Sequence, residues 1–419
     1  MNRNIRYWVL YDFANSFLAA ALEGLYFSQW VIIDNKFPDI WYGAVFSAAT
    51  LVLLITAPFL GSWSDAIGRK MPFLKITTLA MGVFGIILGV IANSYLPTFP
   101  KVLFALGAFF FLQYFYQASL TFYNPLLDQL ASNKNRGLIS GIGQLVNNFG
   151  YVLATGVFLL LVQNHFTLFG EAGRNQVFLP ATILFIFLSL PMMFRFKERA
   201  IDEGQRRAVN AKQVYTNTVN GIRELFTRQR NVGIFLVAFM LISDAILTFS
   251  LFFAIFMQEI YHIPDSQKFI LLGLMSLIVI PSCYLSGKLG DKFGLKKILL
   301  SSCLILIISF LLASISTSVR VVYGLILFIG LGWGGYYTSA RALLVAISPP
   351  KQLGEYFGFY STFQKFASII GPLTWGGITF FFINMGPDRY RVAVFALVIL
   401  MTAGTLLLTR VREEKSNFG

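Results

Sequence analysis

The sequence predicts an all-α polytopic membrane protein, in which twelve transmembrane helices form two pseudo-symmetric bundles of six. Its 419 residues are 56% hydrophobic and only 12% charged, whereas about a quarter of the residues of a typical soluble domain are charged. Long apolar runs recur along the chain, and one loop motif occurs twice. The composition places the chain in a bilayer, and the repeat divides it into halves.

The apolar runs define the expected helices, because a helix needs about 20 apolar residues to cross a hydrocarbon core about 30 Å thick. Such runs cover residues 6–33, 40–63, 71–94, 100–128, 137–163, 176–195, 231–261, 267–287, 296–316, 319–347, 354–383 and 389–410. We therefore expect an N-terminal six-helix bundle over 1–195, a cytoplasmic linker over 196–230 and a C-terminal six-helix bundle over 231–419.

The repeated motif is glycine, three residues, aspartate, two residues and glycine, with paired cations after it. Its copies are Gly61-Ser-Trp-Ser-Asp65-Ala-Ile-Gly68-Arg69-Lys70 and Gly287-Lys-Leu-Gly-Asp291-Lys-Phe-Gly294-Leu-Lys296-Lys297. Each copy follows a long apolar run at about the same place in its half. Duplicated halves around a central site are an architecture of secondary transporters.

Basic residues predict the orientation of the helices. With both termini cytoplasmic, the inside segments hold 24 of the 33 Lys and Arg residues and the outside loops hold 7. This bias follows the positive-inside rule. The same cations explain the net charge of +14, because they lie beside anionic membrane lipids, so we expect no nucleic-acid partner.

Other functional classes find little support. The first apolar run contains Asp12 and lacks a small-residue cleavage site, so it is a retained helix and not a signal peptide. Cys283 and Cys303 lie inside predicted spans, and His165 and His262 lie in separate loops, so we expect neither disulfides nor a metal site. Phosphate loops and protease motifs are missing from the sequence. We expect no cofactor and no enzymatic activity.

The paired motif, the twelve spans and the long central linker resemble the major facilitator superfamily. A narrower resemblance is to its vacuole-effluxer-like branch, which includes the fungal vacuolar amino-acid effluxer linked to autophagy and bacterial relatives. The segments that carry it are Tyr11-Asp12-Phe13-Ala14-Asn15-Ser16, Phe122-Tyr123-Asn124-Pro125, Arg136-Gly137, Gly354-Glu355-Tyr356-Phe357-Gly358, Lys365 and Gly371-Pro372. The compact length and short N-terminus favour a bacterial inner membrane over a vacuole, and we expect the transporter to be a monomer.

The resemblance also assigns a conformational latch to the repeated motif. It implies that Asp65 and Arg69 hold the bundles together in the outward-facing state, with Asp291 as a weaker counterpart. The expected geometry is a short turn between helices with a glycine at each end, namely Gly61 and Gly68 in one copy and Gly287 and Gly294 in the other. The alternative is a tight turn whose cations only set topology.

Ionisable residues inside the spans are the main functional candidates, because burying a charge in a bilayer is costly. Asp12 and Glu23 are eleven residues apart and share one helical face. We expect Glu23 to carry protons, because desolvation favours the neutral form of a carboxyl. Asp12 is a further proton-coupling candidate, and its alternative roles are a cap or gate residue and a substrate ligand. Asp244 is the matching acid of the second half. The alternative is a permanent ion pair of these acids with Arg341 or Lys365.

Neutral polar residues complete the predicted substrate cavity, although some of them are expected to form hydrogen bonds between helices instead. The cavity candidates are Asn15, Gln113, Gln117, Asn124, Gln144, Asn147, Asn148, Tyr337, Arg341, Gln364 and Lys365. A cavity with both signs of charge suits zwitterions. We therefore expect a secondary active transporter that moves an amino acid, a related zwitterion or an organic anion by alternating access, coupled to protons. The alternatives are an uncoupled lipid translocase and a transporter-like solute receptor.

Overall fold

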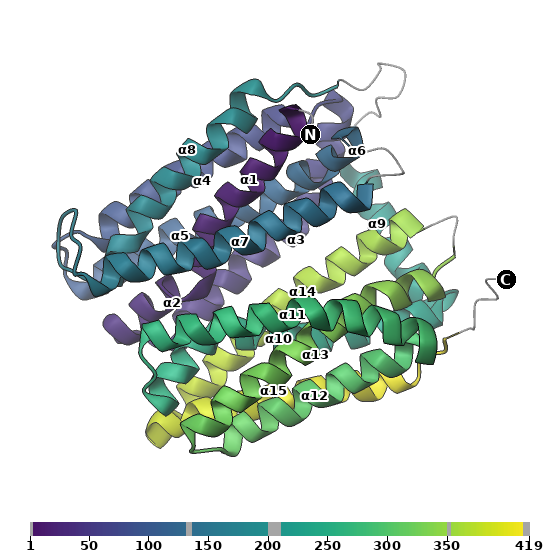
Figure 1. The fold of residues 1–419 in the computed structure, drawn as a ribbon. Coiled ribbons are helices and arrows are strands. Elements are labelled where there is room, and N and C mark those ends of the chain that lie inside the picture. Colours follow the sequence, from purple (N-terminus) through teal and green to yellow (C-terminus); the bar gives the residue numbers. More distant parts are fainter. Residues whose placement is uncertain (1–2, 131–135, 200–210, 350–352, 414–419) are drawn as a thin grey trace. The chain divides into compact units, whose positions relative to one another are not determined.

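The computed structural model describes residues 3–130, 136–199, 211–349 and 353–413, and all regular secondary structure in these ranges is helical (Figure 1). The chain divides into two compact units, Met1–Tyr215 and Thr216–Gly419. This boundary falls inside the segment 196–230 that the sequence marks as a linker. The predicted all-α polytopic architecture is confirmed.

Six long helical segments make up the first unit. Its elements are α1 (Arg3–Ala19), η1 (Ala20–Gly24), α2 (Phe27–Gln29), η2 (Trp30–Asp34), α3 (Asp39–Ile67), α4 (Met71–Ala92), α5 (Thr98–Tyr123), η3 (Asn124–Leu126), α6 (Leu127–Leu130), α7 (Arg136–Gln163), η4 (Arg174–Val177) and α8 (Phe178–Arg195). The first four elements follow one another closely and form a single span, 3–34. The boundaries agree with the predicted spans to within a few residues.

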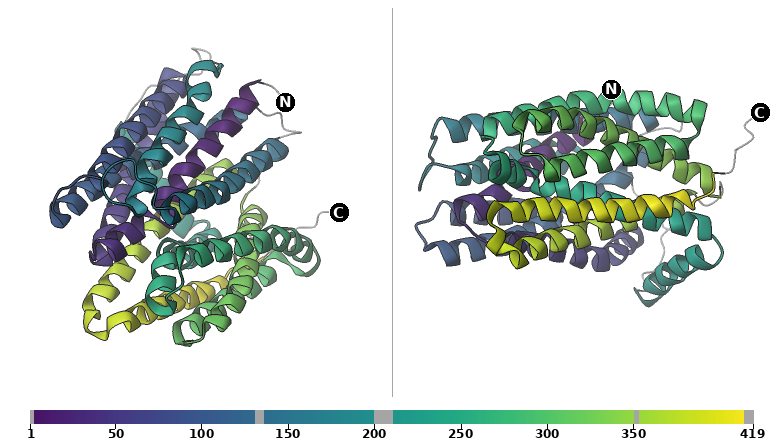
Figure 2. Two further views of the ribbon diagram at one scale, coloured as in Figure 1. Left: turned by 60° about the vertical axis from the view of Figure 1, so that its left-hand side comes forward. Right: turned by 90° about the horizontal axis from the view of Figure 1, so that it is seen from below.

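The second unit repeats this plan after α9 (Ala211–Thr227), which crosses the boundary between the units. Its elements are α10 (Arg230–Tyr261), α11 (Asp265–Phe293), α12 (Leu295–Ile315), α13 (Val319–Ile347), α14 (Leu353–Phe381), η7 (Ile383–Asp388) and α15 (Arg389–Thr409). Residues 200–210 of the expected linker lie outside the described residues. The long helices within each unit run roughly along one direction (Figure 2).

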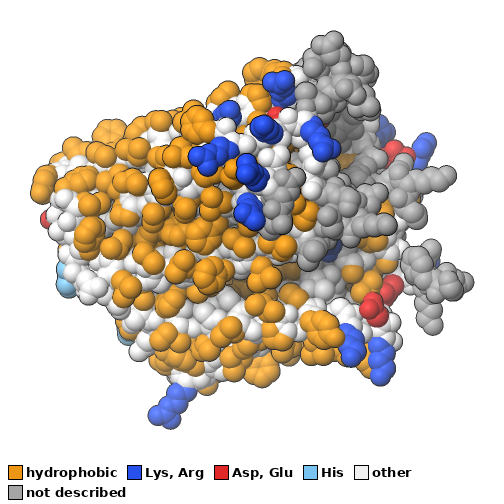
Figure 3. All heavy atoms as spheres, turned by 45° about the horizontal axis from the view of Figure 1, so that its top comes forward, with side chains coloured by type: hydrophobic (Ala, Val, Ile, Leu, Met, Phe, Trp, Pro, Cys, Tyr) orange, Lys and Arg blue, Asp and Glu red, His pale blue; other side chains and the backbone are white. Residues whose placement is uncertain are grey.

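Eleven described helical segments are long and apolar enough to cross a membrane. The remaining predicted span, 354–383, corresponds to the 29-residue helix α14. Gln364, Lys365 and the Gly371-Pro372 pair make this helix less apolar than the others. Hydrophobic side chains cover much of the face in Figure 3, with Lys and Arg grouped on part of it. Large side chains such as Phe187 and Phe194 are exposed, which suits contact with lipid tails.

Two short π-helical segments, η1 and η2, interrupt the first span. A π-helix adds a residue to a turn, and such insertions often occur at functional sites. In this chain η1 contains Glu23. The sequence predicts an unbroken helix here, because the apolar pattern does not register a single added residue.

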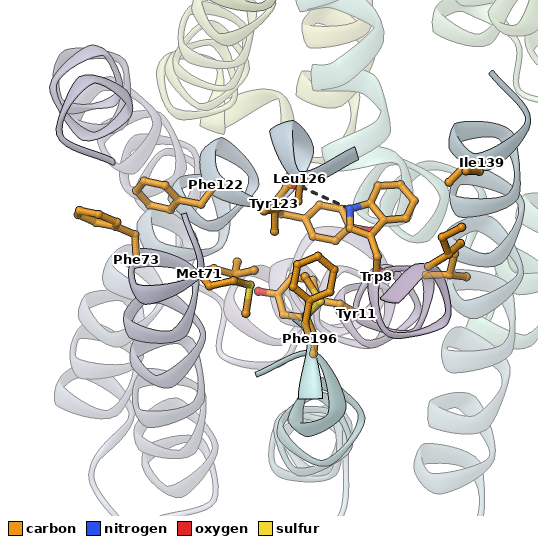
Figure 4. Close-up of a cluster of buried hydrophobic side chains, with 13 residues drawn as sticks. Trp8, Tyr11, Met71, Phe73, Phe122, Tyr123, Leu126, Ile139 and Phe196 are labelled. Carbon is orange, nitrogen blue, oxygen red and sulfur yellow. Dashed lines mark hydrogen bonds between the residues drawn. The ribbon is translucent and has the colours of Figure 1, made fainter. Parts of the chain in front are cut away.

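Aromatic packing fixes one end of the first span (Figure 4). Trp8 and Tyr123 stack with ring centroids 4.9 Å apart. The Trp8 indole Nε1 donates to the Tyr123 carbonyl at 3.4 Å, and the Tyr123 hydroxyl donates to the Trp8 carbonyl at 2.9 Å. Tyr11 packs beside them and shares a hydrogen bond with Thr78 of α4 at 2.8 Å. These contacts join α1 to α4 and α5.

The repeated motif differs from the expected turn. Gly61 and Asp65 lie inside α3, and only Gly68 ends it, with φ 71° in the left-handed region that favours glycine. Helix α11 likewise runs six residues beyond the predicted end at 287, and Gly294 follows it with φ 100°. The prediction of a glycine at each end of a turn is therefore wrong, because helical bonding continues through the first glycine of each copy.

Candidate functional site

Glu23 and Gln113 form the closest polar contact among the predicted site residues of the first unit. The Gln113 amide Nε2, on α5, donates to the Glu23 carboxylate Oε1 at 2.6 Å. Gln113 is fully buried, and its amide oxygen has no hydrogen-bond partner among the described residues. Glu23 is half-buried. The pair joins a π-helical turn to a buried amide that keeps a free acceptor.

Three tyrosines from different helices interact electrostatically with Glu23. Tyr42 of α3, Tyr116 of α5 and Tyr151 of α7 lie within electrostatic range of Glu23. The Tyr151 hydroxyl covers Gly24, where a Cβ atom would lie 2.5 Å from it. None of these tyrosines was among the predicted site residues. A signal was present, since Tyr116 lies three residues after Gln113 on the same helix, a spacing that shares a face.

Asp12 and Asn147 form a second contact in this unit. The Asn147 amide donates to the Asp12 backbone carbonyl at 3.1 Å and to its carboxylate Oδ1 at 3.4 Å. Asn15 lies one turn further along α1 and is 1% exposed, yet neither atom of its amide group has a hydrogen-bond partner among the described residues. Tyr116 lies within electrostatic range of both Asp12 and Glu23.

The remaining cavity candidates of this unit are more dispersed. Gln117 is half-buried, whereas Asn124, Gln144 and Asn148 are exposed. Asn124 is separated from Gln113 and Gln117, because α5 ends at Tyr123 and Asn124 begins a 3₁₀ turn.

Asp244 is the most buried acid described in the second unit, at 1% exposure. Its Oδ1 accepts a hydrogen bond from the backbone N–H of Gly371 in α14 at 2.7 Å. Its Oδ2 has no hydrogen-bond partner within the described ranges. No ion pair joins Asp244 to Arg341 or Lys365 in the part of the chain that the structure describes. The alternative of a permanent ion pair is therefore not what the structure contains.

The two intramembrane cations have different environments. Arg341 of α13 is exposed, whereas Lys365 and its neighbour Gln364 on α14 are half-buried. Tyr337 packs against Tyr336 and Trp333, with ring centroids 5.1 and 6.3 Å away.

Tyr336, which was not a predicted site residue, makes the polar contacts of this tyrosine pair. Its hydroxyl shares a hydrogen bond with Ser243 at 2.9 Å and donates to the Phe239 carbonyl at 3.0 Å. Tyr336 is 1% exposed. It therefore fastens α13 to α10 one residue before Asp244.

In the predicted latch, Asp65 pairs with a different cation from the one expected. The Lys70 ammonium donates to the Asp65 carboxylate at 2.7 Å, while Arg69 is exposed. Asp291 is exposed as well. The observed pair lies within one unit, between the end of α3 and the start of α4.

A hydrogen-bond network joins the segment after α8 to the starts of α1 and α4. We call it the first end clamp, and it was not predicted. Asn4 donates to the Lys197 carbonyl at 2.9 Å and accepts from the Lys197 N–H at 3.4 Å. The next residue, Glu198, accepts from the backbone N–H groups of Lys70 and Met71 at 2.5 and 3.0 Å. A carboxylate at this position satisfies the free N–H groups at the start of α4 and complements the helix dipole.

The second unit contains the same device, the second end clamp. Asn231 exchanges two hydrogen bonds of 2.8 Å with the backbone of Arg412. Glu413 accepts from the backbone N–H groups of Leu295 and Lys296 at 2.8 and 3.1 Å. In both units the segment after the last long helix therefore caps the third helix and holds the start of the first.

The described residues contain no group of three or more His, Cys, Asp or Glu side chains that could hold a metal ion. Cys283 and Cys303 are free thiols.

The family model of the Major Facilitator Superfamily matches residues 11–372 and, in a second alignment, 234–418. The chain belongs to the major facilitator superfamily. As a member of the superfamily it is an integral membrane transporter of small molecules and not an enzyme. The second match covers the second unit, which agrees with the internal duplication.

Relatives of this superfamily member match nearly its whole length at low identity. An uncharacterized MFS-type transporter, YxiO of Bacillus subtilis (strain 168), is 24% identical over 98% of this chain and 95% of its own. The multidrug resistance protein MdtG of Escherichia coli (strain K12 / DH10B) is 23% identical over 94% of this chain and 88% of its own.

Solved structures share the major facilitator fold. The nucleoside transporter NupG has a TM-score of 0.74 at 14% identity and covers 98% of this chain and 100% of its own. A bacterial homolog of the human lysosomal transporter Spinster, inward-facing and unoccupied, has a TM-score of 0.70 at 12% identity, with 97% and 95% covered. A D-xylose–proton symporter has a TM-score of 0.70 at 14% identity, with 99% and 98% covered. The predicted fold is confirmed.

Proposed function

We propose that this chain is a proton-coupled secondary active transporter that moves an amino acid, or a related zwitterion or organic anion, by alternating access. The observation that carries the proposal is a buried or half-buried carboxyl in each unit. Glu23 is held by the amide of Gln113 and Asp244 by the N–H of Gly371. Both donors are uncharged.

A carboxylate inside a membrane requires a compensating positive charge or a proton. Glu23 and Asp244 have no ion-pair partner among the described residues. Each can therefore take up a proton from one side and release it to the other as its access to water changes. A relative of known structure is a D-xylose–proton symporter, which supports the use of protons.

The charges of the second unit favour a substrate with an anionic group. Lys365 lies half-buried on α14, and a lysine at this depth suits a carboxylate. The sequence resemblance to the vacuole-effluxer-like branch also favours an amino acid. We place the transporter in a bacterial inner membrane as a monomer with cytoplasmic termini and two bundles joined by the 196–230 linker, and we assign conformational locking to Asp65, Arg69 and Asp291.

The test is transport by purified protein in liposomes. A proton gradient is imposed in either direction, and accumulation of pooled labelled amino acids is measured. We expect gradient-driven accumulation, which Lys365→Ala abolishes by removing the anion partner. Glu23→Gln and Asp244→Asn remove the proton sites, so we expect both to lose accumulation while keeping solute exchange at saturating concentration.

The matched control is Glu171→Gln, which removes one carboxylate from an exposed loop position and should leave transport unchanged. Unaltered accumulation in both Glu23→Gln and Asp244→Asn would overturn proton coupling through these acids. If no amino acid moves under any gradient, the amino-acid substrate is wrong, and labelled organic acids and fluorescent phospholipid analogues are assayed in the same vesicles.

A further inference from the structure

The membrane interior of the first unit is acidic. Asp12 and Glu23 lie within its first span, whereas every Lys and Arg whose side chain is described in this unit lies in a loop or within five residues of the end of a helical element. Its described ion pairs, Asp65 with Lys70 and Asp34 with Arg174, lie at helix ends. Glu23 therefore receives no cation from its own unit.

Gln113, which contacts Glu23, still offers a hydrogen-bond acceptor. The amide nitrogen of Gln113 is already used on the Glu23 carboxylate, at 2.6 Å. Its amide oxygen is buried and has no partner among the described residues, which is costly unless a donor arrives. A carboxylate and a free carbonyl oxygen thus lie together, and both are acceptors.

Aromatic rings add to this preference for a cation. Tyr42, Tyr116 and Tyr151 lie within electrostatic range of Glu23. The Tyr42 hydroxyl donates to the Leu22 carbonyl at 3.1 Å, so its proton is committed elsewhere. The faces of aromatic rings attract ammonium groups, and carboxylates combined with aromatic rings recognise amines.

We propose that Glu23 and Gln113 form a subsite for the primary ammonium group of the transported solute. Two of its N–H groups match the Glu23 carboxylate and the free Gln113 oxygen, and the surrounding tyrosines stabilise its charge. This inference rests on the proposed function and narrows its substrate class to solutes that carry a primary amine. An organic anion without an amine does not fit this subsite.

The subsite also determines how protons and solute are coupled. When a protonated Glu23 binds an ammonium group, the carboxyl releases its proton and the ammonium replaces it, so one positive charge leaves and one arrives. Among the described residues, the titratable groups that interact electrostatically with Glu23 are the three tyrosines, which are neutral near pH 7. Of the other elements that pack against η1, α1 carries Asp12, Tyr7 and Tyr11 with Arg3 and Arg6 at its start, α7 begins at Arg136, and α8 carries only Arg195 at its end. Solute and proton therefore exchange on one carboxyl.

The experiment measures binding and proton release together in detergent-purified protein. Methyl esters of amino acids, which keep the ammonium and lack the carboxylate, are titrated singly into a weakly buffered solution below pH 7. The N-acetyl derivatives of the same amino acids keep the carboxylate and lack the ammonium. We expect at least one ester to bind and to release up to one proton per molecule bound, while its N-acetyl counterpart does not compete.

Two variants test the residues. Glu23→Gln should weaken binding of the ester by at least about tenfold and abolish proton release, because a charge-assisted hydrogen bond is lost. Gln113→Leu should weaken binding about tenfold but keep proton release, since the carboxyl remains. The thermal midpoint of each variant without ligand checks that it is folded, and Glu171→Gln is the matched control.

Three results would overturn the ammonium subsite: no ester binds, Glu23→Gln binds as tightly as the native chain, or N-acetyl derivatives bind instead of the esters. The proposed function is judged separately by liposome transport. Proton-driven accumulation of N-acetyl amino acids or organic acids would leave the transporter intact and exclude this subsite, whereas the absence of any transport would reject the function itself.

Discussion

The Asp244 carboxylate accepts a hydrogen bond from the backbone N–H of Gly371, so a titratable side chain of α10 is bound to the main chain of α14 at 2.7 Å. The next residue, Pro372, has no N–H and cannot complete the regular bonding of its helix. A Cβ on Gly371 would overlap both Asp244 Oδ1 and Thr248 Oγ1. Asp244 therefore contacts α14 directly beside the proline that interrupts its main-chain hydrogen bonding.

The close approach at Gly371 predicts a sharp penalty for a methyl group. Gly371→Ala should lower the free energy of unfolding by about 1–3 kcal/mol, because the added atom overpacks a buried contact. The matched control is Gly377→Ala on the same helix, where no atom lies within 4 Å of the new Cβ. Thermal unfolding in detergent compares the two variants, and equal midpoints would show that the contact is relaxed at little cost.

The same contact separates two roles of Asp244. Asp244→Asn keeps an oxygen that can accept the Gly371 N–H but cannot carry a proton, so we expect near-native thermal stability with loss of gradient-driven accumulation. Asp244→Leu loses the acceptor and should be destabilised by about 1–3 kcal/mol. Thermal unfolding and liposome transport are measured for both variants. If Asp244→Asn accumulated solute like the native chain, the carboxyl would be only structural.

The first motif predicts opposite effects for its two glycines. Gly68 has φ 71°, so Gly68→Ala should cost about 1 kcal/mol in backbone strain. Gly61 is helical and has open space around it, so Gly61→Ala should be neutral or stabilising by up to about 1 kcal/mol. Thermal unfolding distinguishes them. A larger loss at Gly61 would contradict the helical geometry of the motif.

Loss of either end clamp should destabilise only the helix start that it caps. Glu198→Ala should expose the first N–H groups of α4, and Glu413→Ala should do the same at α12, each costing about 1 kcal/mol of local stability. Hydrogen–deuterium exchange should show faster exchange at Lys70–Leu74 only in the first variant and at Leu295–Leu299 only in the second. Each variant is the control for the other, and identical exchange maps would contradict separate clamps.

The sequence predicted the spans well, because apolar length is a direct consequence of bilayer thickness. It could not place the end of α11, since Lys288, Asp291 and Lys292 look like a loop although helical bonding continues through them. The π-turn at Glu23 was hidden for a similar reason: one added residue leaves the apolar pattern intact.

The site was predicted only in part, because a single sequence does not show which residues of distant segments are in contact. Glu23 and Gln113 were separate candidates, and nothing local indicated that they meet. The residues of the end clamps do recur in the sequence of both units. An Arg-Asn pair occurs at 3–4 and again at 230–231, and a basic residue followed by glutamate occurs at 197–198 and again at 412–413. These pairs look like topology signals until the structure shows what Glu198 and Glu413 bind.

Because each end clamp joins the start of a unit to residues that follow its last long helix, neither unit is complete until that last segment has been synthesised. The first unit acquires its closing bonds when Lys197 and Glu198 leave the ribosome, while more than 200 residues remain to be made. The second must wait for Arg412 and Glu413, which follow α15. As the chain is made from its N-terminus, the closing bonds of the first unit therefore become available before those of the second.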